Sequence, residues 1–205
     1  MPGGGKRFVD ADYIKKAPKN LRQIIFVSDS CAVFADKAPL SAKKGFVLLG
    51  KRGGTIKMIE NGGFLRDRLI RYIRKYPHAD VILNLGSNGN HYPVSNAKRC
   101  IRDYNYFIKR FPKTKFYVAS ITPSEIHVRN SYKNSNTARH ASVLKKAYQK
   151  KGIYIDVYHY LLKHCNYDMR HKRGKFPAGY GLFDTLHLNA TGSTILLKYL
   201  RKSVK

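Results

Sequence analysis

Two short stretches that lie far apart in the chain carry the residue types of a hydrolytic site. The first, Ser28-Asp29-Ser30, ends an apolar run, and the second, Asp184-Thr185-Leu186-His187, lies near the C-terminus. A serine hydroxyl is a weak nucleophile until a base removes its proton, and that base needs a third group to orient it. The chain offers these three types of group in the order serine, aspartate, histidine.

A third stretch, Leu85-Gly86-Ser87-Asn88, lies between the first two and also follows an apolar run. An asparagine amide can donate a hydrogen bond to the negative oxygen that develops during acyl transfer. The three stretches together indicate nucleophilic catalysis with an oxyanion-stabilising group.

Five short apolar runs along the chain are predicted to be strands buried on both faces. They are Gln23–Ser28, Gly45–Leu49, Asp80–Leu85, Lys115–Ile121 and Gly152–Val157. Helical patterns lie between most of them, at Phe64–Tyr76, Asn96–Phe111, Arg139–Lys150 and Thr191–Lys202, the last capped by Asn189 or Thr191. This alternation predicts an α/β protein with a five-stranded parallel sheet covered by helices on both faces. Two stretches outside the alternation, Ile121–Thr137 and Cys165–Phe183, are expected to be long loops.

The candidate residues all follow strands in this scheme. Ser30 follows the first strand, Gly53 and Gly54 the second, Asn88 the third, and His187 comes after the fifth. The carboxyl ends of parallel strands share one edge of a sheet, and open α/β sheets bind ligands there. We therefore expect one site at that edge.

The composition indicates one domain with a strongly basic surface. The chain has 205 residues, with 40 Lys and Arg against 12 Asp and Glu, a formal charge of +28. Such an excess predicts attraction to polyanions, unless it only reflects a solvated, lysine-rich surface. Residues 1–20 are expected to be a linker or the remnant of an upstream module, and residues 21–205 the catalytic domain. No apolar run approaches the about 18 residues that a membrane span needs, so a soluble protein is expected.

These residues resemble, block by block, the SGNH hydrolases, also called the GDSL esterase/lipase family. Ser28-Asp29-Ser30 is similar to the Gly-Asp-Ser block, with serine in place of the glycine. Gly53, or Gly54 one position away, is similar to the second block, Gly86-Ser87-Asn88 to the third, and Asp184 with His187 to the Asp-x-x-His block. The resemblance implies a three-layer α/β/α sandwich with the flavodoxin-like strand order.

The resemblance also implies a role for each residue. Ser30 would be the nucleophile, His187 the general base and Asp184 the group that orients the imidazole. The oxyanion hole would consist of the Ser30 N–H, the Gly53 N–H and the Asn88 amide. Gly54, Asn90 and His91 are expected to contact substrate. Asp29 is expected to hold its loop through backbone hydrogen bonds, and Cys31 to be a buried, inert thiol. No metal site and no cofactor are expected.

The expected function is hydrolysis of short acyl esters, such as O-acetyl groups, on a small molecule, a carbohydrate or a cell-wall polymer. Two alternatives stay open: an O-acetyltransferase with the same triad, and a basic polyanion- or nucleic-acid-binding module with a degenerate site. Residues Gly5–Lys16 are similar to the last strand of bacterial SH3-type wall-binding modules. The expected location is therefore extracellular or at a bacterial cell wall, with an anionic wall polymer as a partner and nucleic acid as a less favoured one.

Overall fold

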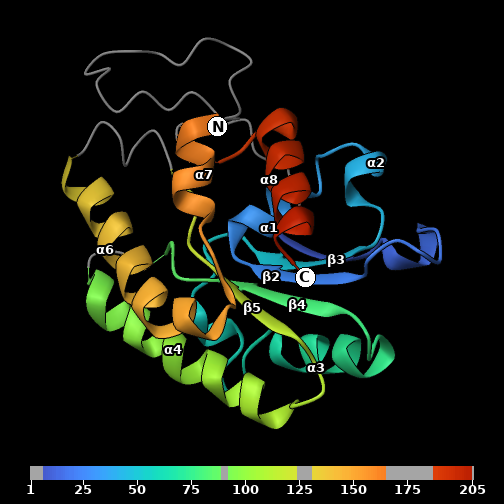
Figure 1. Cartoon of the computed structure of the whole chain (residues 1–205), viewed down its shortest axis with the longest axis horizontal. Helices are drawn as coiled ribbons and strands as arrows, with labels where there is room; N and C mark the ends of the chain where they lie inside the picture. Colours follow the sequence, from blue (N-terminus) through green and yellow to red (C-terminus); the bar gives the residue numbers. More distant parts are fainter. Residues whose placement is uncertain (1–6, 89–91, 124–130, 165–186, 205) are drawn as a thin grey trace.

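The computed structural model describes residues 7–88, 92–123, 131–164 and 187–204. Their strands are β1 (Phe8–Asp12), β2 (Ile24–Ser28), β3 (Phe46–Lys51), β4 (Asp80–Asn84), β5 (Phe116–Ala119) and β6 (Tyr154–Ile155). They form one sheet in the order β1-β3-β2-β4-β5-β6 (Figure 1).

Strands β2 to β6 are parallel, in the expected flavodoxin-like order. The expected number of five strands is wrong by one, because β1 pairs antiparallel with β3, from Phe8 opposite Lys51 to Asp12 opposite Val47. This sixth strand lies within residues 1–20, the stretch expected to be a linker or the remnant of an upstream module.

Helices cover both faces of the sheet, which confirms the three-layer α/β/α arrangement (Figure 1). On one face lie α1 (Ser30–Ala35), α2 (Leu40–Lys43), α7 (Val157–His164) and α8 (Ala190–Ser203). On the other face lie α3 (Arg66–Lys75), α4 (Pro93–Arg110) and α6 (Ser131–Tyr148). Short 3-10 turns are found at Ile14–Lys16, Ile56–Met58 and Gln149–Lys151.

Two apolar cores sandwich the sheet. Alternate residues of a strand point to opposite faces, so Phe26, Leu48 and Ile82 pack with α1, α7 and α8. Val27, Leu49 and Leu83 pack with α3, α4 and α6. Both faces of the central strands are therefore buried, as continuous apolar runs predict.

Two expected boundaries are wrong. The stretch Ile121–Thr137 was expected to be a loop throughout, but α6 already begins at Ser131. The last expected strand, Gly152–Val157, is reduced to Tyr154–Ile155, and Val157 begins α7. The capping expectation for the last helix is confirmed, because the Asn189 side chain accepts a 2.9 Å hydrogen bond from the Gly192 N–H.

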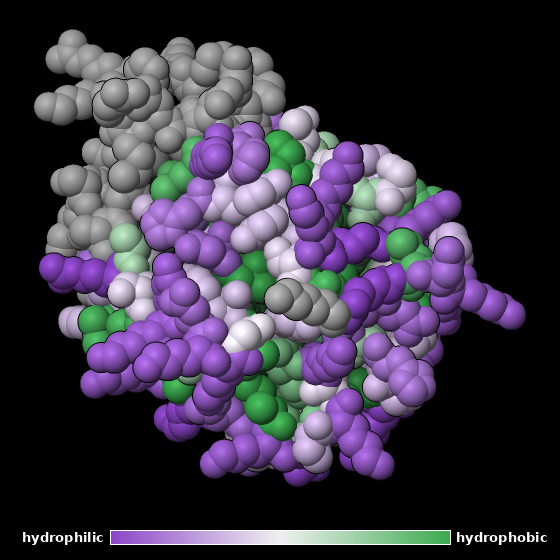
Figure 2. Space-filling model, in the orientation of Figure 1, coloured by the Kyte–Doolittle hydropathy of each residue, from purple (hydrophilic) through white to green (hydrophobic). Residues whose placement is uncertain are grey.

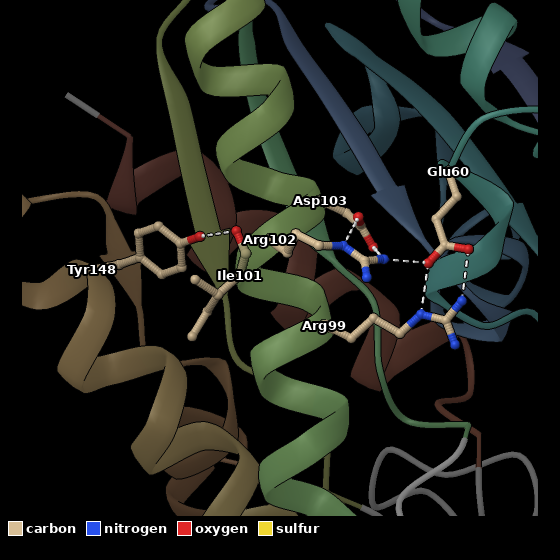
Figure 3. Close-up of polar contacts among 6 residues, drawn as sticks. All are labelled: Glu60, Arg99, Ile101, Arg102, Asp103 and Tyr148. Atoms are coloured by element: carbon tan, nitrogen blue, oxygen red, sulfur yellow. Dashed lines mark hydrogen bonds and ion pairs between the residues drawn. The ribbon is translucent and has the colours of Figure 1, made fainter.

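Ion pairs lie on the outer surface of α4, and a hydrogen bond joins α4 to its neighbour α6 (Figure 3). Arg99 donates two hydrogen bonds to Glu60, of 2.6 and 2.7 Å. Arg102 contacts both Glu60 and Asp103, at 2.9 Å each. The Tyr148 hydroxyl donates to the Ile101 carbonyl at 3.3 Å and ties α6 to α4.

Hydrophilic side chains cover most of the face shown in Figure 2, with small apolar areas between them. Within the described parts of the chain, no helix is both long and apolar enough to cross a membrane.

Candidate active site

Ser30 is the first residue of α1, directly after β2 and Asp29. Asp29 is the N-cap, and its Oδ1 accepts a 3.2 Å hydrogen bond from the Cys31 N–H. Ser30 is only 9% exposed. Aspartate is a favourable N-cap because it accepts from an N–H that has no partner within the helix. The cap therefore fixes the backbone on which the candidate nucleophile sits.

Asp29 also ties this turn to the loop after β4, because the Ser87 hydroxyl donates to its other carboxylate oxygen. Burial raises the pKa of Asp29, and the hydrogen bonds from Ser87 and the Cys31 N–H act in the opposite direction. The expectation that Asp29 holds its loop through hydrogen bonds is confirmed. Cys31 is buried as expected, and burial raises the pKa of its thiol.

Asn88 connects the loop after β4 with the loop after β3. Its Nδ2 donates a 2.8 Å hydrogen bond to the Gly54 carbonyl. The start of the same loop is held by α4, since Asn96 Nδ2 donates to the Gly86 carbonyl at 2.7 Å. Gly86 has φ +119 and lies against the His140 ring, so a Cβ there would come within 2.5 Å of Nε2. The structure thus brings the Gly86–Asn88 loop beside both Asp29 and Gly54.

Gly53 and Gly54 differ in their surroundings. Gly53 has φ +68, a conformation that favours glycine, and nothing lies within 4 Å of where a Cβ would be. Gly54 packs against Met58, and its N–H donates to the Lys51 carbonyl at 3.0 Å, closing the turn. Because the Gly54 N–H is used within the turn, Gly53 is the better candidate for an outward-facing donor.

His187 stacks on Phe34, with ring centroids 4.1 Å apart and planes inclined by 14°. Phe34 lies four residues after Ser30 in α1, and residues spaced by four share one face of a helix. This contact brings His187 to the side of α1 on which Ser30 lies. The Asn189 cap of α8 then sets the direction of the chain after His187.

A buried polar chain crosses three strands beneath these loops. The Ser28 hydroxyl donates to Asn84 Oδ1 at 2.8 Å, and Asn84 Nδ2 donates to the Ser120 carbonyl at 2.7 Å. The Ser120 hydroxyl in turn accepts from the Tyr158 N–H at 2.9 Å. These bonds lock the ends of β2, β4 and β5 together. That edge includes the neighbouring ends of β2 and β4, where the strand order reverses, and open α/β sheets bind ligands at such switch points.

The described residues place Ser30, Gly53, Gly54 and Asn88 in loops and a helix start that follow β2, β3 and β4, and His187 two residues before the N-cap of α8. Asp184, Asn90 and His91 lie outside the described residues. Sequence reasoning missed the supporting side chains of Phe34, Asn84 and Asn96. Of these three, only Phe34 had a signal in the sequence, because it lies four residues after Ser30 and so shares its face of the helix. A hydroxyl, an imidazole and amide donors at one sheet edge are the groups that acyl transfer uses.

No protein-family model matches the chain, and a search of curated proteins gave no significant match. Solved structures do match. The lipase/acylhydrolase of Enterococcus faecalis is 15% identical, with TM-score 0.58 over 89% of this chain and 94% of that one. An acetylxylan esterase of Geobacillus stearothermophilus, solved as a catalytic mutant, is 11% identical, with TM-score 0.59 over 89% and 93%.

A third solved structure is the C-terminal catalytic domain of peptidoglycan O-acetyltransferase A from Streptococcus pneumoniae. It is 11% identical, with TM-score 0.56 over 89% of this chain and 92% of that one. At these identities the likeness shows a shared fold.

Proposed function

Starting from the SGNH hydrolase fold of this chain, we propose that the protein is a serine esterase that acts on short acyl esters. The observation that carries the proposal is that contacts join the loops bearing the candidate residues at one edge of the sheet. Asp29 beside Ser30 contacts Ser87, and Asn88 contacts Gly54. His187 reaches the same helix as Ser30 through Phe34.

In the proposed reaction the Ser30 oxygen attacks the acyl carbon while His187 takes the hydroxyl proton. His187 then gives this proton to the leaving alkoxide, and an acyl-serine remains. Water attacks the acyl-serine, His187 again moves the proton, and the free acid leaves. Asp184 would orient the imidazole and stabilise its charged form.

The developing oxyanion would be held by the N–H groups of Ser30 and Gly53 and by the Asn88 amide. Asn88 Nδ2 carries two N–H groups, and the bond to the Gly54 carbonyl uses one and fixes the direction of the other. Pre-oriented donors of this kind stabilise a transition state by about 3–4 kcal/mol each.

An acetyl group on a carbohydrate is the substrate that we favour. Two of the solved structures with this fold are named for acetyl chemistry on xylan and on peptidoglycan. The rim of the site adds support, because Lys51 at the end of β3 and Arg52 directly after it are basic, whereas long acyl chains need apolar surroundings. An O-acetyltransferase would use the same groups, with a sugar hydroxyl in place of water.

A panel of p-nitrophenyl esters tests this function. The wild-type protein should release p-nitrophenol from the acetyl ester faster than from the palmitoyl ester, and Ser30→Ala should abolish release. Ser142→Ala, at an exposed position of α6, is the matched control and should keep full activity. Full activity in Ser30→Ala would refute the proposal, and product analysis with a glycan acceptor separates transferase from hydrolase.

A second candidate function, binding of an anionic polymer, is favoured by the charge balance. Ion pairs occupy most carboxylates that the structure describes, among them Asp10, Asp12, Glu60, Asp80 and Asp103. With 40 Lys and Arg against 12 Asp and Glu, the cations outnumber the carboxylates by 28. We propose an anionic cell-wall polymer as the partner and an extracellular or wall-associated location. The affinity for this polymer should fall steeply as the salt concentration rises. Tighter binding to nucleic acid of equal charge would contradict the choice of a wall polymer as the partner.

A further inference from the structure

Arg52 lies in the turn that carries the candidate oxyanion glycine. It follows the last residue of β3 and precedes Gly53, and its N–H donates to the Arg7 carbonyl at 2.8 Å. The Gly54-to-Lys51 hydrogen bond closes the turn around it. The position of the Arg52 side chain is therefore set by the same backbone that sets Gly53.

The Arg52 guanidinium lies over the ring on which the candidate base stacks. Its carbon Cζ is 5.2 Å from the centroid of the Phe34 ring, and this ring stacks on His187 at 4.1 Å. A second cation, Lys37 Nζ, lies 4.5 Å from the same centroid. The imidazole and two positively charged groups thus all contact the same aromatic ring.

Three other arginines near the sheet pair with carboxylates. Arg99 pairs with Glu60, Arg68 with Asp10 and Arg22 with Asp80 (Figure 3 shows the first). Among the residues that the structure describes, Arg52 forms no ion pair, although it is half-buried. A partly desolvated guanidinium without a carboxylate is a ready partner for an anionic group from outside.

We propose that Arg52 binds a carboxylate of the substrate, so that the preferred ester sits on an acidic sugar. This inference rests on the proposed esterase function and specifies its substrate class. The planar guanidinium donates in a fork that matches a carboxylate with two parallel hydrogen bonds, which a lysine cannot reproduce. The carboxylate would lie on the sugar that bears the acyl group or on its neighbour, since Arg52 adjoins Gly53 in sequence.

A structural role is the competing explanation, because a guanidinium over Phe34 also stabilises the ring through a cation–π contact. The two roles predict different results. If Arg52 only supports Phe34 and His187, its loss slows every ester to the same extent. If Arg52 binds a carboxylate, its loss slows acidic substrates more than neutral ones.

The test compares O-acetylated oligogalacturonate, whose sugars carry carboxylates, with neutral acetylated xylo-oligosaccharides. For each protein the ratio of kcat/KM on the acidic substrate to that on the neutral substrate is measured at low salt. In Arg52→Gln this ratio should fall about tenfold, the size expected for one lost charged hydrogen-bonding partner. Arg52→Lys should keep part of the ratio. The control Arg74→Gln, exposed on α3, should keep all of it.

Binding measured without turnover separates this inference from the esterase proposal. In a Ser30→Ala background, Arg52→Gln should raise the Kd for oligogalacturonate about tenfold and leave the Kd for xylo-oligosaccharide unchanged. An unchanged Kd and an unchanged ratio would overturn the inference while the esterase function stands. An inactive wild-type protein whose oligogalacturonate binding still depends on Arg52 would overturn the esterase function and keep the carboxylate site.

Discussion

The hydroxyl of Ser28 donates a 2.8 Å hydrogen bond to Asn84 Oδ1 and thereby joins the last residues of β2 and β4. Both side chains are buried. Ser28 stands where the Gly-Asp-Ser block has glycine, and Asn84 supplies the partner that a buried hydroxyl needs. The departure from the block is thus accommodated by one side chain of the neighbouring strand.

Replacing Ser28 by Ala should lower the free energy of unfolding by about 1–3 kcal/mol, because Asn84 Oδ1 would be left buried without its donor. Urea denaturation followed by circular dichroism measures this loss. Ser142→Ala on the exposed side of α6 should stay within about 0.5 kcal/mol of the wild-type value. An equally stable Ser28→Ala protein would mean that water or a rearranged Asn84 replaces the bond.

The base and its orienting group can be tested by His187→Ala and Asp184→Asn. Each should lower kcat for p-nitrophenyl acetate about 10³-fold or more with little change in KM, because proton transfer fails after substrate has bound. His159→Ala, an exposed histidine of α7, serves as the control. If His187→Ala kept more than a tenth of the wild-type kcat, another group would have to be the base.

Removal of the Asn88 amide should lower kcat by about 10²–10³-fold, because a donor to the oxyanion acts mainly in the transition state. Asn88 also holds the Gly54 carbonyl, so loosening of the loop has to be measured separately. Asn96→Ala does this, because it frees the Gly86 carbonyl of the same loop without removing the proposed donor. A loss in Asn96→Ala as large as in Asn88→Ala would assign the effect to loop geometry alone.

His140 should make the protein less stable in acid. Its ring is fully buried beside Cys100 and Gly86, and burial lowers its pKa from 6.5 to about 4. Between these pH values the unfolded chain binds a proton at His140 that the folded protein does not. Stability is therefore complete above pH 6.5 and falls by about 3 kcal/mol as the pH drops to 4.

Urea denaturation at pH 7, 6, 5 and 4 measures this slope. His140→Gln should flatten it, whatever its effect on stability at pH 7, whereas His78→Gln at an exposed position should leave it unchanged. If His140→Gln left the dependence of the unfolding free energy on pH unchanged, the carboxylates would have to cause the acid sensitivity.

The sequence predicted those strands whose burial on both faces shows as an unbroken apolar run. Continuous apolar runs identified β2 to β5 because these strands are covered on both faces. Strand β1 lacks this signal, since only Val9 of its residues is fully buried. Its Asp10 and Asp12 are unfavourable in strands and are tolerated because cations and tyrosines of α3 bind them.

The start of α6 was missed for a similar reason. Its first residues are polar and poor helix formers, yet Asn136, Thr137 and His140 are buried against the rest of the molecule. In the candidate site, the motif residues could be found from their types and spacing. The groups that hold them, such as Asn84 and Asn96, could not, because asparagines in strands and helices carry no local signal of a partner far away in the sequence.

The pairing of β1 with β3 bears on self-association. An uncovered edge strand offers free N–H and C=O groups to the strands of other molecules, and β3 is apolar and buried from Phe46 to Leu49. Strand β1 occupies that edge with a less apolar sequence, in which Asp10 and Asp12 bind side chains of α3, while β6 at the opposite edge has only two residues. Proteolytic removal of β1 would expose the backbone of β3 to other chains. Because β1 carries no candidate catalytic residue, aggregation would come before any loss of catalytic groups.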